Sequence, residues 1–260
     1  MPVLIFGDVH GEVGALRNLL ARAREIAGTA DIEVFSVGDL IDRGPDAKGV
    51  IQTCIDEGVK LVLGNHELWL HRWFTEGVFD DFALSGVMGG LATFRSYDPG
   101  FAPSFTTPDP EAIAVLKGIP DAHRDYILSG LPYRAIEIAG TVYRLTHGGV
   151  PDGLGELMVK DIMDHDGVPD EAAACDLLIP AVLEINPSAI LWGGAKRGRV
   201  FQFPDGSVQV FGHTPWGATA DLSPERGYIA LDTGCGTCPP RMLSGVLLTE
   251  DGDRRIVTSR

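Results

Sequence analysis

Five short polar segments of the chain carry side chains that could bind metal ions or phosphate. They read GDVHG at 7–11, GDLIDRG at 38–44, GNHE at 64–67, THGG at 146–149 and FGHTP at 211–215. Divalent metal ions accept carboxylate, amide and imidazole donors, and these segments contain six such side chains: Asp8, His10, Asp39, Asn65, His147 and His213. One Asp-x-His pair alone usually marks a turn, but five such segments together favour a metal site.

Six donors are too many for one ion that must also leave room for a substrate. They suit two ions that share a bridging carboxylate, and two ions about 4 Å apart can activate water and hold a phosphoryl oxygen. The glycines beside the donors permit tight turns and a close approach of the backbone to phosphate. The donor set therefore predicts hydrolytic chemistry on a phosphoester.

The region before residue 76 alternates between strand and helix patterns, which gives the first three segments a common position. Strands are expected at 3–6, 33–37 and 59–63, and helices at 12–28, at 46–57 and from about Glu67. This alternation predicts parallel β-α-β units. The loops at the carboxyl ends of parallel strands then form the ligand-binding edge of the sheet.

The rest of the chain is expected to contain an insertion followed mostly by strands. Residues 76–130 combine a Gly- and Pro-rich stretch with short amphipathic helices, so they are expected to form a helical insertion, or lid, over the sheet edge. Strands are expected at 133–146, with a tight turn at Ala139-Gly140, and at 189–192, 200–203, 208–211, 228–231 and 243–259. No repeat or linker divides the chain, so residues 1–260 are expected to form a single domain.

Composition and charge argue against several classes of partner. The formal net charge is -15, and a folded acidic chain without a basic run is not expected to bind a nucleic-acid polymer. No segment is apolar over the roughly 20 residues of a membrane span. The 4 cysteines fit a reducing compartment without disulfides. A cytoplasmic protein is expected, and its oligomeric state is left open.

In order and spelling, the five segments resemble the calcineurin-like metallophosphoesterases and, within them, the phosphoprotein phosphatase family. The bacterial members of that family are related to the symmetrical dinucleoside tetraphosphatases. The resemblance covers residues 3 to about 235 and implies an α/β fold, with a β-sandwich of two mixed sheets flanked by helices (α/β/β/α). It also implies two divalent metal ions, with Mn²⁺ expected first and Fe, Zn, Co or Ni as alternatives.

Carried over by motif, the metal ligands divide between the two ions. Asp8, His10 and Asp39 would hold the first ion. Asp39, Asn65, His147 and His213 would hold the second ion, so that Asp39 bridges the pair. Asn65 is expected to contact the substrate as well.

The resemblance also implies three catalytic roles. His66 is similar to the proton donor to the leaving group, Asp42 to the carboxylate that orients this histidine, and Arg43 to a clamp for phosphate. A histidine beside a carboxylate keeps its proton because its cation is stabilised, and an arginine fork matches two phosphate oxygens. An ion pair between Asp42 and Arg43 remains an alternative use for both residues.

The chain departs from the family pattern at the second phosphate-binding arginine. Many bacterial members carry it two residues after a tryptophan, whereas here Trp192 is followed by GGAKRGR. Arg197 is the candidate for this clamp, with Lys196 and Arg199 as rivals. The position of the second clamp bears directly on substrate preference.

Several other reactive residues are expected to be structural. His71, His123 and His165 match no motif and are interpreted as packing or surface residues. Cys235 and Cys238 have a zinc-like spacing, but no second pair or nearby histidine completes a tetrahedral set. Cys235 would instead line the pocket, Asp232 would cap a turn, and Glu67 would brace its loop or cap the helix that follows.

Three functions are compatible with these residues. The first is hydrolysis of phosphomonoesters, as in a serine/threonine protein phosphatase, by attack of a metal-activated hydroxide with His66 as general acid; its substrate would be a phosphoprotein or a small phosphoester. The second is a symmetrical bis(5'-nucleosyl)-tetraphosphatase, which cleaves diadenosine tetraphosphate. Such relatives often lack an Asp before Arg-Gly and read GNHD, whereas this chain has Asp42 and Glu67. The third is a non-catalytic metal-binding scaffold, a hypothesis weakened by the complete set of ligands.

Overall fold

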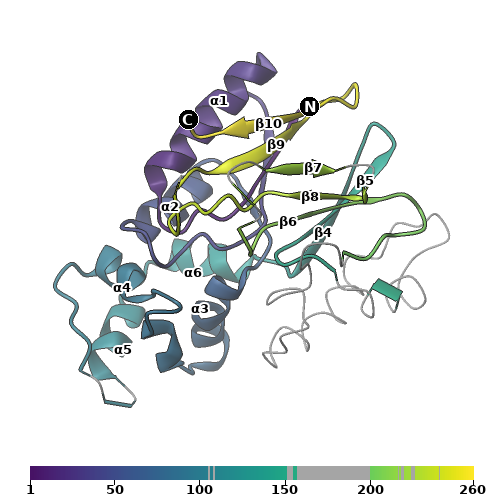
Figure 1. Cartoon of the computed structure of the whole chain (residues 1–260). Helices are drawn as coiled ribbons and strands as arrows, with labels where there is room; N and C mark the ends of the chain where they lie inside the picture. The colour runs from purple at the N-terminus through teal and green to yellow at the C-terminus, as the bar shows by residue number, and fades with distance from the viewer. Residues whose placement is uncertain are drawn as a thin grey trace.

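Two mixed β-sheets of five strands each form the centre of the fold (Figure 1). The computed structural model describes residues 1–150 except 105 and 108, residues 155 and 156, and residues 200–260 except 216, 218, 219, 224, 225 and 240. The expected strand at 189–192 and residues Lys196, Arg197, Arg199, His165 and Cys175 lie outside this part. The α/β fold with two mixed sheets flanked by helices is confirmed.

The first sheet has the strand order β10-β9-β1-β2-β3. Its strands are β1 (Val3–Phe6), β2 (Glu33–Ser36), β3 (Lys60–Leu61), β9 (Ser244–Leu248) and β10 (Arg254–Thr258). β1, β2 and β3 run parallel, as the β-α-β pattern predicts, and β9 runs antiparallel to both β1 and β10. The carboxyl ends of the three parallel strands therefore lie at one edge.

The second sheet has the strand order β4-β5-β6-β8-β7. Its strands are β4 (Tyr133–Ile138), β5 (Thr141–Thr146), β6 (Val208–Phe211), β7 (Asp221–Ser223) and β8 (Tyr228–Ala230). β5, β6 and β8 are parallel to one another. The hairpin between β4 and β5 turns at Ala139 and Gly140, both with positive φ, as expected.

The helices gather on the first sheet and at one end of the molecule (Figure 1). They are α1 (Val13–Ala27), α2 (Ala47–Asp56), α3 (Asn65–Glu76), the 3₁₀ helix η1 (Asp81–Leu84), α4 (Leu91–Tyr97), α5 (Pro110–Lys117) and α6 (Asp121–Leu128). α3 begins at Asn65, two residues before the expected start. None of the helices in the described part is long and apolar enough to cross a membrane.

Two of the apolar clusters in the described part of the chain explain this layering. One lies between the sheets and includes Ile5 and Phe35 of the first sheet and Leu145 and Val210 of the second. The other joins the first sheet to the helices, where α1 buries residues at helical spacing, Leu16, Leu19, Leu20 and Ala23. The central strands β1 and β9 are therefore buried on both faces, which fixes their register.

One expected strand is wrong. Residues 200–203 form no strand. The hydrogen bonds of their backbone go to separate groups and not to one neighbouring strand. The N–H of Phe201 donates to the carbonyl of Val150 at 3.1 Å, and the side-chain amide of Gln209 donates to the carbonyl of Phe201 at 2.5 Å. The apolar spacing here marks a loop that pairs with no strand in the described part of the chain.

A buried arginine stabilises the strand that leads to one expected metal ligand. Arg144 of β5 is fully buried and donates to the hydroxyl oxygens of Ser207, at 2.6 Å, and Tyr133, at 2.9 Å. It also pairs with the carboxylate of Asp205 at 2.6 Å and lies over the ring of Phe203. Because Thr146 ends β5 just beyond this residue, the arginine fixes the strand that ends beside His147.

Replacing Arg144 by methionine is expected to lower the free energy of unfolding by about 3 kcal/mol, because the buried hydroxyls of Ser207 and Tyr133 lose this donor and Asp205 loses its cation. Arg255→Met is the control: its ion pair with Asp253 is half-exposed, so the loss should be below about 0.5 kcal/mol. Urea unfolding of both variants measures the difference. Equal losses in the two variants would contradict the structural role assigned to Arg144.

Candidate metal centre

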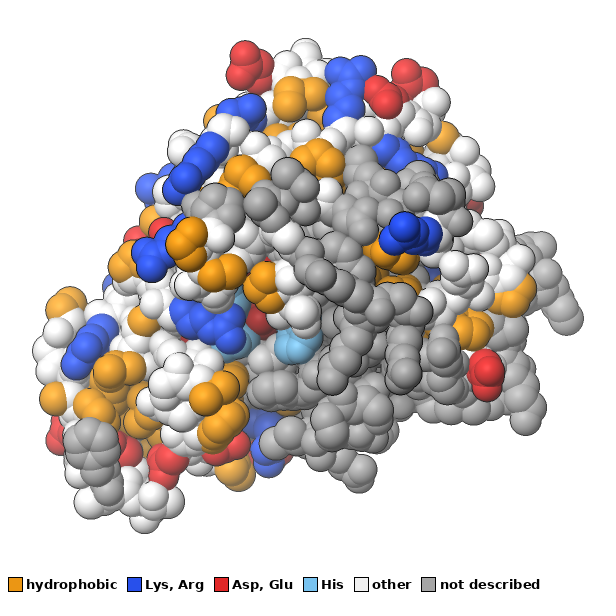
Figure 2. All heavy atoms as spheres, viewed as in Figure 1, with side chains coloured by type: hydrophobic (Ala, Val, Ile, Leu, Met, Phe, Trp, Pro, Cys, Tyr) orange, Lys and Arg blue, Asp and Glu red, His pale blue; other side chains and the backbone are white. Residues whose placement is uncertain are grey.

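Loops from both sheets meet at the carboxyl ends of the parallel strands. The loops after β1, β2, β3, β5 and β6 carry the six expected ligands: Asp8, His10, Asp39, Asn65, His147 and His213. All six are buried except the half-buried His213. Figure 2 shows histidine side chains partly visible on one face of the molecule, beside a basic and an acidic side chain. The structure therefore brings together the residues that the five sequence segments contain.

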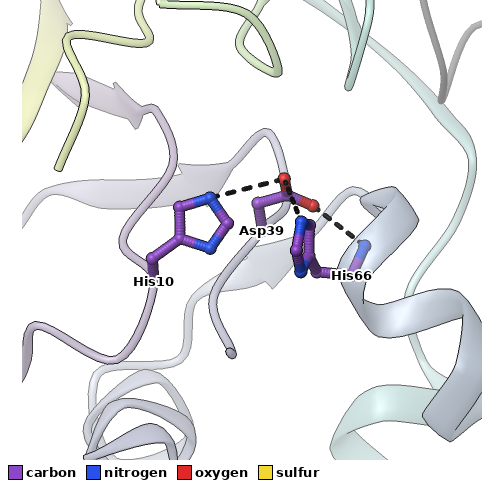
Figure 3. Close-up of side chains that lie close together, drawn as sticks. All are labelled: His10, Asp39 and His66. Atoms are coloured by element: carbon purple, nitrogen blue, oxygen red, sulfur yellow. Dashed lines mark hydrogen bonds and ion pairs between the residues drawn. The ribbon is translucent and has the colours of Figure 1, made fainter. Parts of the chain in front are cut away.

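The first group of donors consists of His10, Asp39 and His66 (Figure 3). The carboxylate oxygen Oδ2 of Asp39 lies 3.7 Å from Nε2 of His10 and 3.8 Å from Nε2 of His66. Nδ1 of His10 is 2.9 Å from the carbonyl of Ile41, to which it donates, so Nε2 carries the lone pair. Burial, the largest effect, lowers the pKa of His10 to about 3, which keeps this imidazole neutral.

The second group consists of Asp39, His147 and His213. Nε2 of His147 lies 3.0 Å from Oδ1 of Asn65, 3.1 Å from Nδ1 of His213 and 3.2 Å from Oδ1 of Asp39. Burial lowers the pKa of His147, but Asp39 outweighs it and the pKa rises to about 10. A positive charge is therefore favoured at this point among the donors.

Asp39 belongs to both groups, which are consistent with a two-metal site that shares this carboxylate. As the distances define it, the first group contains His66 and does not contain Asp8; the assignment of Asp8 to an ion stays a prediction. Asp8 lies beside the loop of His213, whose backbone N–H both of its carboxylate oxygens accept at 3.1 Å.

The charges of the buried carboxylates also fit a bound cation. Asp8, Asp39 and Asp232 are all at most 4% exposed. Burial and the charge of Asp232 raise the pKa of Asp8 well above its usual range, and burial and Asp39 raise that of Asp232 to about 6. Carboxylates that repel one another in this way are stabilised by a divalent ion, and the oxygen and nitrogen donors present suit one.

His66 is held by a carboxylate, as the motif resemblance implies. Its Nδ1 donates to Oδ2 of Asp42 at 2.8 Å. Asp42 also accepts the indole N–H of Trp69 at 3.1 Å and the hydroxyl of Thr93 at 2.7 Å. Burial alone would lower the pKa of His66, but the charges of Asp39 and Asp42 outweigh it and raise the pKa. The imidazole keeps a proton more readily than an ordinary histidine does.

Arg43 is exposed at the mouth of the site. Its Nη1 lies 2.6 Å from Nε2 of His10 and donates to the lone pair there. Arg43 thus contacts His10, and Asp42 bonds to His66. The structure does not show the alternative ion pair between Asp42 and Arg43. The same lone pair of His10 is the one that a metal ion would take, so ion binding requires the exposed guanidinium to move.

Glu67 performs both of the structural tasks expected of it. Its buried carboxylate accepts the backbone N–H groups of Asp39 at 2.9 Å, Leu40 at 2.7 Å and Gly64 at 2.9 Å. The bond to Gly64, the residue before α3, caps that helix. The bonds to Asp39 and Leu40 tie the loop after β2 to the loop after β3.

The remaining reactive residues have structural surroundings. His123 contacts the hydroxyl of Tyr97 at 2.8 Å and the side chain of Gln52 at 3.1 Å. His71 lies on α3 beyond the ligand loop and belongs to neither donor group. Asp232 accepts the N–H of Gly234 at 2.8 Å in the expected turn. Cys235 and Cys238 follow Asp232 in the same loop. These two cysteines and Cys54 form no disulfide.

An apolar cavity of about 210 Å³ adjoins the donors. It is lined by Asn65 and by side chains of α3 and of the segment that follows: Leu68, Trp69, Arg72, Asp80, Phe82, Ala83 and Met88. The segment from Asp80 to Met88, within the expected insertion, therefore forms one wall of a pocket beside an expected ligand.

Comparison with known proteins agrees with this geometry. A family model described as calcineurin-like phosphoesterase matches residues 1–217. The chain is 40% identical to the symmetrical bis(5'-nucleosyl)-tetraphosphatase of Edwardsiella ictaluri over 72 residues, which are 27% of this chain and 25% of that protein. It is 36% identical to serine/threonine-protein phosphatase 1 of Salmonella typhimurium, over 28% of this chain and 40% of that protein. The similar segment thus spans less than half of each relative.

One solved structure with the same fold is the cold-active protein-tyrosine phosphatase of a psychrophilic Shewanella species. It superposes with a TM-score of 0.55 at 18% identity, covering 98% of this chain and 80% of that chain. At this identity the likeness concerns the fold alone.

Metal binding should depend on the absence of a side chain at Gly212. A Cβ atom there would lie 2.0 Å from Oδ1 of Asp8, so Gly212→Ala must displace this carboxylate. We expect the affinity for Mn²⁺, measured by isothermal titration calorimetry, to fall by at least about tenfold. Gly14→Ala is the control, because a Cβ at this exposed position of α1 meets no atom within 4 Å. Unchanged affinity in Gly212→Ala would argue against Asp8 as a ligand.

Proposed function

The chain belongs to the calcineurin-like phosphoesterases, and from that membership we propose that it hydrolyses phosphomonoesters, with phosphoserine and phosphothreonine in proteins as its main substrates. The observation that carries this proposal is the hydrogen bond of 2.8 Å between Nδ1 of His66 and the carboxylate of Asp42. It leaves Nε2 of His66 facing the carboxylate shared by the two donor groups.

Two divalent ions, with Mn²⁺ as our first candidate, would be held by the six donors from the five loops. We assign Asp8, His10 and Asp39 to one ion, and Asp39, Asn65, His147 and His213 to the other. The burial of these donors and the sharing of Asp39 support this assignment. When bound, the ions would supply an activated water and neutralise the phosphoryl oxygens.

His66 would act as the general acid. The alcohol side chain of serine or threonine leaves as a strongly basic alkoxide, so its departure requires a proton in the transition state. The carboxylate of Asp42 supplies the charge that keeps this proton on His66 and the hydrogen bond that orients the ring. A leaving nucleotide phosphate is a much weaker base and gains far less from such an acid, which favours phosphomonoesters as substrates.

Arg43 would bind the phosphate, because its exposed guanidinium stands beside the donor groups. Arg197 is retained as the candidate for the second clamp on the grounds of sequence alone. The insertion at 76–130 would contribute to substrate selection, since its segment from Asp80 to Met88 lines the apolar cavity next to Asn65.

A dinucleoside tetraphosphatase remains the second candidate, favoured by the 40% identity to the Edwardsiella ictaluri enzyme over 72 residues. Turnover of a phosphoserine peptide and of diadenosine tetraphosphate by the Mn²⁺-loaded protein separates the two functions. We expect kcat/KM for the peptide to be higher by at least about tenfold. His66 supplies the proton that an alkoxide leaving group requires, whereas a nucleotide leaving group gains little from it. A preference of that size for the nucleotide would overturn the proposal. Absence of hydrolysis after verified metal loading would support the scaffold hypothesis instead.

Substitutions at Asp39 and His66 should separate metal binding from proton donation. Asp39→Asn removes the shared charge, so both metal content and turnover should fall. His66→Asn should leave the metal content unchanged and lower kcat for phenyl phosphate by about 100-fold, but for p-nitrophenyl phosphate by only a few-fold, because general acid catalysis matters most for basic leaving groups. Plasma emission spectrometry and steady-state kinetics measure these quantities.

The grouping of His66 with His10 and Asp39 makes the metal content of His66→Asn decisive. A histidine whose Nδ1 is held by a carboxylate can also bind a metal through Nε2. If His66→Asn loses an ion, His66 is a ligand and the assignment of the general acid fails.

A further inference from the structure

The carboxylate of Asp42 is held by a residue of the insertion. Thr93 lies in α4, 51 residues further along the chain, and is 1% exposed. Its hydroxyl donates to Oδ1 of Asp42 at 2.7 Å, while the N–H of His66 Nδ1 and the indole of Trp69 donate to Oδ2. Both oxygens of this fully buried carboxylate are therefore occupied by donors.

The hydroxyl of Thr93 also accepts a hydrogen bond from the backbone of Asp42. The N–H of Asp42 donates to Oγ1 at 2.9 Å. Because this N–H takes a lone pair of the hydroxyl, the hydroxyl proton is directed at the carboxylate. One side chain thus bonds both the backbone and the carboxylate of Asp42, whose φ of 70° lies in the left-handed region.

A second contact joins the insertion to the adjacent residue. The N–H of Arg43 donates to the carbonyl of Gly89 at 3.1 Å. The turn before α4 packs closely here: a Cβ on Gly90 would lie 2.5 Å from the carbonyl oxygen of Ala83. The segment from η1 to α4 and the loop at Asp42 and Arg43 therefore form one bonded unit.

We propose that Thr93 is a positioning residue for proton transfer, which holds Asp42 in the conformation that orients His66. The inference rests on the proposed role of His66 as general acid. It assigns the insertion a part in the chemical step in addition to any part in substrate selection. The hydroxyl acts through Asp42 and does not itself touch the substrate.

The test compares Thr93→Val, which keeps the shape and removes the hydroxyl, with Thr93→Ser, which keeps the hydroxyl. Thr53→Val, at a buried threonine of α2, is the matched control. Each Mn²⁺-loaded variant is assayed on phenyl phosphate and p-nitrophenyl phosphate, with metal content and thermal unfolding measured in parallel. If Thr93→Val does not fold, Thr93→Ala, which suits a helix, replaces it.

For Thr93→Val we expect kcat on phenyl phosphate to fall by roughly tenfold or more, and kcat on p-nitrophenyl phosphate by no more than about twofold, at unchanged metal content. Thr93→Ser should stay within about threefold of the wild type on both substrates. Equal losses on the two substrates in Thr93→Val, or the same losses in Thr93→Ser, would overturn the inference.

The same two substrates separate this inference from the proposed function. If His66→Asn shows a loss that depends on the leaving group and Thr93→Val does not, His66 remains the acid and Thr93 is merely structural. If His66→Asn itself shows no such dependence, the proposed acid is wrong and the inference about Thr93 fails with it.

Discussion

The carboxylate of Glu67 is the interaction on which the arrangement of the donors depends. It accepts backbone N–H groups from the loop after β2 and from the residue before α3. Parallel strands bring these loops to the same edge, but only a shared acceptor fixes their distance. With Glu67 in place, the N–H of His66 reaches Oδ1 of Asp39 at 3.1 Å, so the shared carboxylate and the candidate acid are positioned together.

Three of the six donors and two neighbouring site residues are held in strained backbone conformations, which indicates why so many bonds converge on them. Within the described part of the chain, seven residues other than glycine have a positive φ, and five of them are expected site residues: His10, Asp39, Asp42, Arg43 and His213. A left-handed conformation costs about 1 kcal/mol or more for such a residue. The surrounding bonds from Glu67, Thr93 and Gly89 offset that cost and keep the side chains directed at one point.

The sequence brings the six donor side chains to one edge because each of them lies within about four residues of the end of a strand. Local apolar runs and glycines locate β1, β2 and α1 closely, and the carboxyl ends of parallel strands must meet. Residues 200–203 mislead because apolar spacing alone does not supply a partner for a ladder. Thr93 and Trp69 carry no signal in the sequence, because their bonds to Asp42 form only when distant segments pack together. The closeness of His66 to His10 and Asp39 depends on side-chain directions that no motif specifies.

The position of β1 in the first sheet has a consequence for the order of folding. β1 lies between β2 and β9, and Val3 pairs with Leu248 in β9 as well as with Glu33 in β2. The strand that leads to Asp8 therefore gains one neighbour early in translation and the other only after β9 has been synthesised. Contacts so distant along the chain slow folding, so the first donor loop to leave the ribosome is among the last to be held on both sides.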